Sequence, residues 1–190
     1  MARYYCYHSN HMDSPRINAL KRYEILDTPA EGNFDRITLL ASKVFNVPIA
    51  IVSLVDEDRI WFKSSQGLGD IQEIDKSPGL CASAILADDI YLVEDARNDP
   101  RSLANPLVTG TFGLQFYAAA PLKTHDGYNL GTFCIIDRKK RYINTDQQAL
   151  LGQMAEIVMH EMELRLAART QTRMLEQRIA ELEAQLDAAR

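Results

Sequence analysis

The chain has 190 residues, enough for one domain of about 150 residues and an appendage, and its apolar content of 46% can bury a single core. The net charge is −5, with 21 basic and 26 acidic residues mixed along the chain, so no basic surface suited to nucleic acid is evident. No apolar run approaches the roughly 20 residues that cross a bilayer, and the first residues, MARYYCYHSNHM, lack the apolar core of a secretory signal. We therefore expect a cytoplasmic protein that binds neither nucleic acid nor membrane.

The cysteines and the first residues suggest no metal or disulfide site. Cys6, Cys81 and Cys134 form neither a disulfide framework nor a CxxC pair, which fits a reducing compartment. Cys6 lies with His8 and His11 in a CxHxxH pattern, but only three ligands are local and nothing nearby completes a site. We interpret residues 1–15 as a leader, disordered or partly non-native.

The next segment predicts two helices. Apolar residues in Ile17–Leu26 indicate a short helical lead-in. Thr28 is a candidate N-cap, because Pro29 would take the first helical position and Glu31 would complete a capping box. In the helix that follows, one apolar stripe should face the core. That stripe comprises Phe34, Ile37, Leu40, Ala41, Val44 and Phe45.

Two paired strands are predicted after this helix. Pro48 ends the helix, and the run IAIVSLVD that follows is β-branched and too short for a helix, which indicates a central strand. Ile60–Ser65 should return as its hairpin partner, with Trp61 and Phe62 supplying large buried surface.

Residues 69–115 are irregular in pattern. They contain a predicted short helix at Gly79–Leu86 and a short strand at Tyr91–Glu94. Turn-forming residues such as Asp95 and Asn105–Pro106 dominate the rest. Because long loop-rich insertions in compact domains usually carry function, we expect functional residues here.

A hairpin is predicted at Phe116–Asp137, with Asp126 and Gly127 in its turn. Its strands are apolar at nearly every position, so both faces of the sheet should be covered, one by helices and the other by a loop-built pocket. The hairpin brings the expected antiparallel sheet to about five to six strands.

The last segment predicts one long helix. A capping box can be formed by Asn144 with Gln147 or by Thr145 with Gln148, and no proline follows before Arg190. The first half of the helix carries a mostly apolar stripe expected to lie against the sheet: Leu150, Met154, Ile157, Val158, Glu161 and Leu164. The second half carries apolar residues at the spacing of a coiled-coil seam: Leu175, Ile179, Leu182, Leu186 and Ala189.

These features predict a coiled-coil extension over residues 166–190 that pairs two copies of the chain. The alternative is a solvated terminal helix that frays.

Over roughly Ile17 to Arg165 the chain resembles the GAF domain superfamily, small ligand-sensing modules of signalling proteins. The resemblance is carried by the blocks ALKRYEILDTPAE, FDRITLLASKVFNVPIAIVSLVDEDRIWFKS, LCASAI, VEDARNDPR, NPLVTG, FYAAAPL and DGYNLGTFCIID. It implies an α+β fold over residues 16–165, with helices from both ends of the chain on one face of an antiparallel sheet and a loop-built pocket on the other. Bacterial modules of this kind precede histidine kinase or diguanylate cyclase outputs.

Departures from the family limit the choice of ligand. Cys81 is followed by Ala82 and Ser83, without the histidine that a bilin site needs. The Asn-Lys-Phe-Asp-Glu set of cyclic-nucleotide-binding relatives has no equivalent, and His125 and His160 are poor candidates for haem ligands. The sequence thus identifies no cofactor.

Two groups of residues are candidates for a ligand site. Asp95, Asp99 and Arg101 could bind a polar ligand, although turn formation and an ion pair among them explain the same residues. The candidates for lining the pocket, which could instead simply fill the core, are Ser53, Cys81, Phe116 and Tyr117.

The expected function is a non-enzymatic sensory module that binds an unknown small molecule, dimerises through its C-terminal helix and acts on an output domain or protein. One alternative is a thiol-dependent reductase of free methionine sulfoxide, in which Cys81 attacks and Cys134 resolves. No lysine or histidine adjoins Cys81 in sequence to lower its pKa, which disfavours this chemistry. The other alternative is a structural dimerisation module without a ligand.

Overall fold

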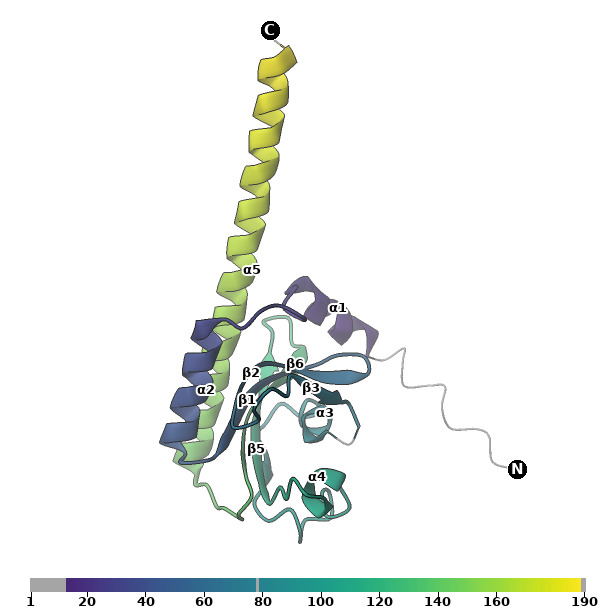
Figure 1. The fold of residues 1–190 in the computed structure, drawn as a ribbon, viewed down its shortest axis with the longest axis vertical. Helices are drawn as coiled ribbons and strands as arrows, with labels where there is room; N and C mark the ends of the chain where they lie inside the picture. The colour runs from purple at the N-terminus through teal and green to yellow at the C-terminus, as the bar shows by residue number, and fades with distance from the viewer. Residues whose placement is uncertain (1–12, 78, 189–190) are drawn as a thin grey trace, which may run out of the picture.

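The computed structural model describes residues 13–77 and 79–188, which form an α+β fold (Figure 1). Six antiparallel strands make one sheet in the order β3-β2-β1-β6-β5-β4. The strands are β1 (Ile49–Val55), β2 (Arg59–Gln66), β3 (Glu73–Asp75), β4 (Tyr91–Val93), β5 (Phe116–Lys123) and β6 (Asn129–Asp137). The helices are α1 (Ser14–Arg22), α2 (Gly32–Val44), α3 (Leu80–Ala84), α4 (Pro106–Thr109) and α5 (Thr145–Ala188). The predicted fold class is confirmed.

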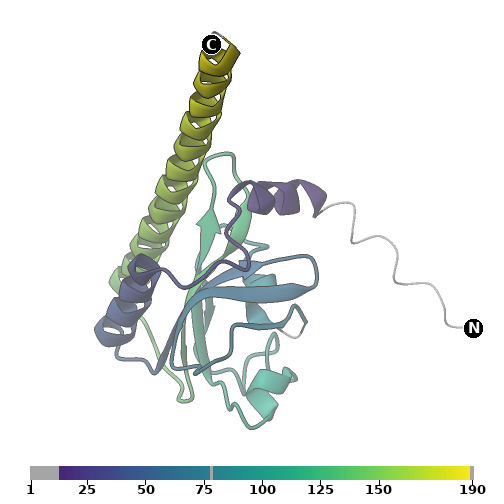
Figure 2. The same cartoon turned by 45° about the horizontal axis from the view of Figure 1, so that its top comes forward.

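Both faces of the sheet are covered. Helices α2 and α5 lie side by side on one face, here called the helix face, and α3 and α4 lie on the other, here called the loop face (Figures 1 and 2). The central strands β1 and β6 are buried at every residue, because each face packs against its own apolar core. The loop face, where the sequence predicts a pocket, is filled by side chains that include Ile51, Leu80 and Leu114.

The predicted capping box at Thr28 is wrong. Helix α2 begins at Gly32, and its N-cap residue Glu31 makes no side-chain capping bond. The Thr28 hydroxyl instead donates to the carbonyl of Ile25 at 2.6 Å and accepts from Lys63 at 2.9 Å. Thr28 therefore fixes the turn before the helix and the buried Lys63, and the helix begins four residues after it.

The buried stripes of α2 and α5 are rotated from the predicted ones. In α2 the buried residues include Phe34, Thr38 and Ala41, whereas Leu40 is 54% exposed. In α5 the predicted Ile157 is 52% exposed. The buried residues of α5 are Leu151, Met154, Ala155, Val158, Met159 and Met162. Each helix packs against the sheet and against the other helix, so spacing alone did not reveal which part of a broad apolar face turns inward.

The loop-rich segment is more ordered than predicted. The expected short helix is limited to α3, and the expected strand is β4. Neither β3 nor α4 was predicted. The side chain of Asn105 accepts a hydrogen bond from Leu107 N, and Pro106 stands in the first turn, so a pair interpreted as a turn begins a helix.

Helix α5 begins with one of the two predicted capping boxes. Asn144 N donates to Gln147 Oε1 at 3.0 Å, and Gln147 N donates to Asn144 Oδ1 at 2.8 Å. The helix then continues for 44 residues and projects beyond the sheet (Figures 1 and 2). In the part of the chain that the structure describes, no helix is long and apolar enough to span a membrane.

Candidate functional site

Five polar or thiol side chains meet inside the loop face and are here called the loop-face cluster. They are Ser53, Cys81, Tyr117, Thr132 and Cys134, and all are buried. Side chains two residues apart on a strand point to the same face of the sheet. Ser53 on β1 pairs with Thr132 on β6, and Cys134 lies two residues further along β6, so all three side chains point to the loop face. Tyr117 comes from β5, and α3 places Cys81 over these strands.

Hydrogen bonds link the members of the loop-face cluster. The hydroxyls of Ser53 and Thr132 are 2.9 Å apart, and Tyr117 Oη donates to Cys81 Sγ at 3.3 Å. The thiol of Cys134 and the hydroxyls of Ser53, Tyr117 and Thr132 lower the pKa of Cys81. The hydrogen bond with Cys81 and burial raise the pKa of Cys134, and burial raises that of Tyr117. Cys81 is therefore the thiol that ionises first.

The structure brings together three of the four predicted pocket-lining residues. Ser53, Cys81 and Tyr117 belong to the loop-face cluster, whereas Phe116 points to the helix face and packs in the other core. Adjacent strand residues point to opposite faces, so Phe116 and Tyr117 could not both line one pocket. The same alternation could have identified Thr132 as a partner of Ser53.

The predicted residues Asp99 and Arg101 pair with each other at the surface. Arg101 Nε donates to Asp99 Oδ1 at 3.0 Å, which helps to lower the pKa of Asp99, and Arg101 Nη2 donates to the carbonyl of Leu92. The Arg101 guanidinium also lies 4.9 Å from the ring centre of Tyr91. Asp95, Asp99 and Arg101 line a surface cavity of about 420 Å³.

Aromatic rings connect this surface to the loop-face cluster. The ring of Tyr91 meets that of Tyr117 edge to face, with centroids 6.1 Å apart. A continuous path of contacts therefore runs from Asp99 and Arg101 through these two rings to Cys81.

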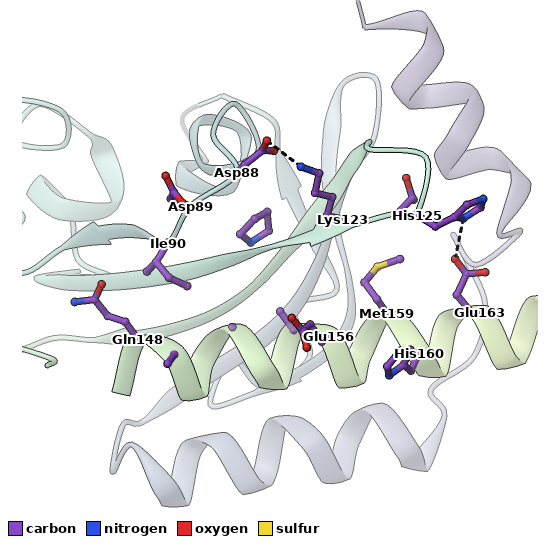
Figure 3. A pocket seen from close by; sticks show the side chains of 15 residues that line it. Asp88, Asp89, Ile90, Lys123, His125, Gln148, Glu156, Met159, His160 and Glu163 are labelled. Carbon is purple, nitrogen blue, oxygen red and sulfur yellow. Dashed lines mark ion pairs between the residues drawn. The ribbon is translucent and has the colours of Figure 1, made fainter. Parts of the chain in front are cut away.

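A second cavity, of about 610 Å³, lies between α5 and the end of β5 (Figure 3). Lys123 pairs with Asp88 at 2.9 Å at its rim, and Met159 and Glu156 of α5 point into it (Figure 3). The sequence patterns gave no indication of this cavity, because its lining comes from segments far apart in the chain.

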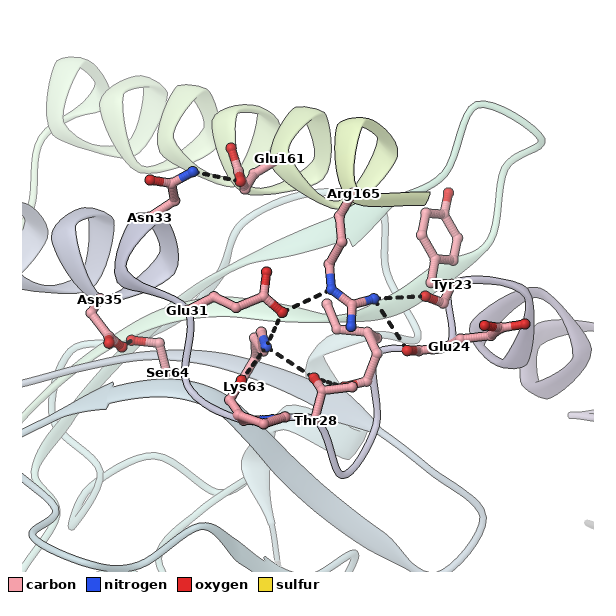
Figure 4. A network of polar contacts seen from close by, with 12 residues as sticks. Tyr23, Glu24, Thr28, Glu31, Asn33, Asp35, Lys63, Ser64, Glu161 and Arg165 are labelled. Atoms are coloured by element: carbon pink, nitrogen blue, oxygen red, sulfur yellow. Dashed lines mark hydrogen bonds and ion pairs between the residues drawn. The ribbon is translucent and has the colours of Figure 1, made fainter. Parts of the chain in front are cut away.

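A polar network ties the sheet to α5 on the helix face (Figure 4). Lys63 donates to Thr28 Oγ1, Pro29 O and Glu31 Oε1 at 2.8–2.9 Å, and Arg165 Nε of α5 donates to the same Glu31 oxygen at 2.8 Å. Burial lowers the pKa of Lys63 against the opposing effect of Glu31. Burial opposes ionisation of Glu31, but the two cations prevail and lower its pKa.

A β-bulge lets Lys63 and Ser64, neighbours on β2, both face the helix face, where Lys63 donates to Glu31 and Ser64 donates to Asp35. Val52 pairs with Ser64 and Ser53 pairs with Phe62, so Lys63 is the extra residue on β2. Its side chain is 0% exposed. A lysine in a strand ordinarily indicates a solvent-facing position, which is why sequence reasoning missed this site.

The connection between α1 and α2, residues 23–31 and here called the strap, wraps against α5. Arg165 Nη1 donates to the carbonyls of Tyr23 and Glu24 at 3.1 Å, and Arg173 forms two hydrogen bonds with the Glu24 carboxylate. Glu24 and Asp27 have φ angles of 45° and 58°, a left-handed conformation that is costly for residues other than glycine. Arg165, Arg169 and Arg173 are spaced four residues apart and therefore lie on one side of α5. This spacing was the sequence signal that could have predicted the contact with the strap.

The predicted CxHxxH pattern of Cys6, His8 and His11 lies outside the described residues. Among residues 13–77 and 79–188, no group of three or more His, Cys, Asp and Glu side chains is arranged to hold a metal ion.

Comparisons with known proteins identify the family. The GAF domain family model matches residues 29–162. The chain is 40% identical over 136 residues to a cyclic di-GMP phosphodiesterase from Pseudomonas aeruginosa, a match that covers 71% of this chain and 23% of that protein. The chain thus spans less than a quarter of that relative.

Solved structures show the same fold. The GAF domain of an Acinetobacter phosphoenolpyruvate-protein phosphotransferase superposes with a TM-score of 0.60 at 14% identity, covering 83% of this chain and 96% of that one. A free methionine-R-sulfoxide reductase from Neisseria meningitidis superposes with a TM-score of 0.60 at 15% identity, covering 88% and 99%. These similarities show the fold, and the family model that matches residues 29–162 shows that the chain belongs to the GAF domain family.

Proposed function

We propose that the chain is a non-enzymatic regulatory GAF module of a cytoplasmic signalling protein, which forms a homodimer through α2 and α5 and transmits changes of its sheet along α5. The observation that carries the proposal is the second half of α5, which leaves the domain with an exposed apolar seam. The seam residues are Leu175, Ile179, Leu182 and Leu186. A regular apolar seam on a solvated helix is typical of coiled coils, where a second copy covers it.

Exposed apolar residues nearer the domain support the same partner. Leu40 and Val44 on α2, and Ile157 and Leu164 on α5, are about half exposed or more. The two helices adjoin, since Asn33 of α2 donates to Glu161 of α5 at 2.7 Å. A second copy that pairs along the seam would also cover these residues, so that one continuous interface would extend from the domain into the extension.

The network of Lys63, Glu31 and Arg165 supports transmission along α5. Lys63 lies in the bulge of β2 opposite Ser53, a member of the loop-face cluster, and Arg165 lies where α5 leaves the domain. A change on the loop face can therefore reach α5 through the hydrogen bonds of Lys63, Glu31 and Arg165, whose strength depends on their geometry. Such a change must stabilise one of two helix arrangements over the other to act as a signal.

The input in this proposal is a small polar molecule bound beside Asp95, Asp99 and Arg101. Arg101 lines the cavity there and contacts the ring of Tyr91. Tyr91 in turn contacts Tyr117, a member of the loop-face cluster. Thermal-shift measurements over a metabolite panel, with Arg101→Ala as the control, test this input. A panel that stabilises neither protein would favour a ligand-free structural module.

The output in this proposal is a catalytic domain or protein that turns over a second messenger. The support is the relative from Pseudomonas aeruginosa, a cyclic di-GMP phosphodiesterase most of whose length lies outside the matched region.

The dimer is tested by substitution within the seam. Ile179→Asp with Leu182→Asp places charges at seam positions and should convert the dimer to a monomer, as measured by light scattering coupled to size exclusion. Gln177→Asp with Ala184→Asp, two outward positions of the same heptads, is the matched control and should leave the dimer intact. A wild-type chain that is monomeric at high protein concentration would contradict the proposal.

A second candidate function is reduction of free methionine sulfoxide, favoured by the meeting of Cys81 and Cys134 in one cluster. None of the cavities described above is lined by Cys81, which argues against substrate access. Turnover of methionine sulfoxide with a thiol reductant, lost in Cys81→Ser, would establish this function.

A further inference from the structure

The loop-face cluster contains two free thiols that the proposed regulatory role does not use. Cys81 and Cys134 are free and buried in the same apolar core, and Tyr117, which donates to Cys81, lies two residues from Ala119, the strand partner of Cys134. We propose that Cys81 and Cys134 form a redox-active dithiol, which a small hydroperoxide converts into an intramolecular disulfide. This chemistry requires neither the homodimer nor a bound ligand.

The two cysteines lie on elements of different rigidity. Cys134 is in β6, between β1 and β5, and is held on both sides by backbone pairing. Cys81 is in α3, a helix of five residues whose N-cap Gly79 makes no side-chain capping bond. A disulfide needs the sulfurs to approach to about 2 Å, so the short helix is the part that would move toward the sheet.

Hydroxyl groups replace the cation that usually activates a thiol. Tyr117 Oη donates to Cys81 Sγ at 3.3 Å, and the hydroxyls of Ser53 and Thr132, which are 2.9 Å apart, belong to the same cluster. These contacts and the Cys134 thiol lower the pKa of Cys81 while that of Cys134 is raised. The cluster thus contains one thiol suited to attack and one that keeps its proton for the second step.

The reaction balances with a hydroperoxide as the oxidant. The Cys81 thiolate attacks the outer peroxide oxygen, which breaks the O–O bond, forms a sulfenic acid after protonation and releases water or an alcohol. The Cys134 sulfur then attacks the sulfenic sulfur; its proton and the leaving hydroxide form water, and the S–S bond closes. Two electrons pass from the two thiols to the peroxide.

Because both sulfurs are buried, only a small oxidant is expected to reach them. Cys81 and Cys134 are both almost inaccessible, so a disulfide reagent such as oxidised glutathione cannot reach either sulfur without opening the domain. Hydrogen peroxide is close to water in size and needs only a brief displacement of α3. Fast reaction with peroxide and slow reaction with bulky reagents is therefore the expected pattern.

The experiment treats the full chain, in a Cys6→Ser background, with hydrogen peroxide. The expected result is a mass loss of about 2 Da and a tryptic cross-link between residues 77–97 and 124–138, reversed by dithiothreitol. Cys134→Ser should give no cross-link, and dimedone should trap the sulfenic acid on Cys81. Tyr117→Phe, which removes only the donor to Cys81, should react about tenfold more slowly.

Two results would overturn the dithiol. One is the absence of the cross-link in folded protein under conditions that oxidise the same chain in denaturant. The other is peroxide oxidation of Cys81 at the same rate in Tyr117→Phe, with circular dichroism unchanged. Light scattering on the same samples separates the two proposals, because an intact dimer without a cross-link rejects only the dithiol and a cross-linked monomer rejects only the dimer.

Discussion

Lys63 shows how a charged side chain is accommodated between a sheet and two helices. Its ammonium group has three donors and meets three oxygens, those of Thr28, Pro29 and Glu31. Burial of a charge is tolerated when it is paired and hydrogen-bonded in this way, and removal of one partner leaves the others without compensation.

Lys63→Met should therefore lower the free energy of unfolding by about 2 kcal/mol, because three acceptors lose their donor while the apolar stem is largely retained. Chemical denaturation measures the change. Lys21→Met is the matched control, since Lys21 forms an exposed ion pair with Glu57 at 2.8 Å and its loss should leave the denaturation midpoint unchanged. Equal effects of the two substitutions would contradict this account of Lys63.

Asp13 provides a prediction for the dependence of stability on pH. Hydrogen bonds from Arg16 and Lys76 lower its pKa from 3.8 to about 2 in the folded protein. The unfolded chain takes up the proton first as the pH falls, so the stabilising contribution of Asp13 is complete above about pH 4 and disappears near pH 2. Because the carboxylate is about one-third exposed, we expect about 1 kcal/mol.

The measurement is the stability difference between wild type and Asp13→Asn across that range of pH. The difference should be largest near pH 7 and should vanish near pH 2. A difference that stays constant down to pH 2 would show that the pKa of Asp13 is not lowered.

At the scale of elements, the strap depends on α5 for its conformation. Arg165 donates to backbone carbonyls of the strap and to the Glu31 side chain, and it is largely buried. The left-handed residue Glu24, whose carbonyl accepts from Arg165, would relax without those contacts.

Arg165→Met should therefore release the strap without unfolding the sheet. Amides of residues 23–31 should exchange with solvent about tenfold faster, while those of β1 and β6 keep their protection. Hydrogen exchange followed by mass spectrometry measures this difference. Arg178→Met, which removes only an exposed pair with Glu181, should change neither segment.

Local chemistry and periodicity predicted most elements, but the side that each helix buries depends on its neighbours. The hairpin of β5 and β6 and the cap at Asn144 follow from signals within a few residues. The rotation of α2 does not, because its apolar residues continue around the helix past Leu40 and only packing against the sheet and α5 selects a side. Similarly, alternation could group Ser53 with Tyr117 and Thr132. No local pattern foretells the bulge that lets Lys63 and Ser64 face the same side of the sheet.

At the scale of the whole molecule, the sheet domain and the α5 extension form one elongated body. With 44 residues at 1.5 Å each, α5 is about 65 Å long, and about half of it has no contact with the sheet. A seam of about two heptads is short for a stable coiled coil, so the apolar residues of α2 and the first half of α5 should contribute much of the affinity between two copies.

Leu40→Asp with Ile157→Asp should accordingly weaken the dimer at least about tenfold even though the seam is intact. Sedimentation velocity over a concentration series measures the dissociation constant. Leu86→Asp is the control, because Leu86 is 84% exposed and follows α3 of the loop face, whereas α2 and α5 lie on the helix face. Weakening of similar size by Leu86→Asp would contradict the assignment of the interface.

The contacts of Arg165 also restrict how α5 can move. The buried side chains of α5 are packed into the core on the helix face, so a slide of the helix along its axis would disturb that packing. Hydrogen bonds to Glu31, Tyr23 and Glu24 have fixed directions, so a slide of one helical turn would break all of them. A tilt that pivots on Arg165 keeps them and swings the far end of α5 sideways. If α5 transmits a change of the sheet, as proposed, these contacts favour a tilt of α5 about Arg165 over a slide along its axis.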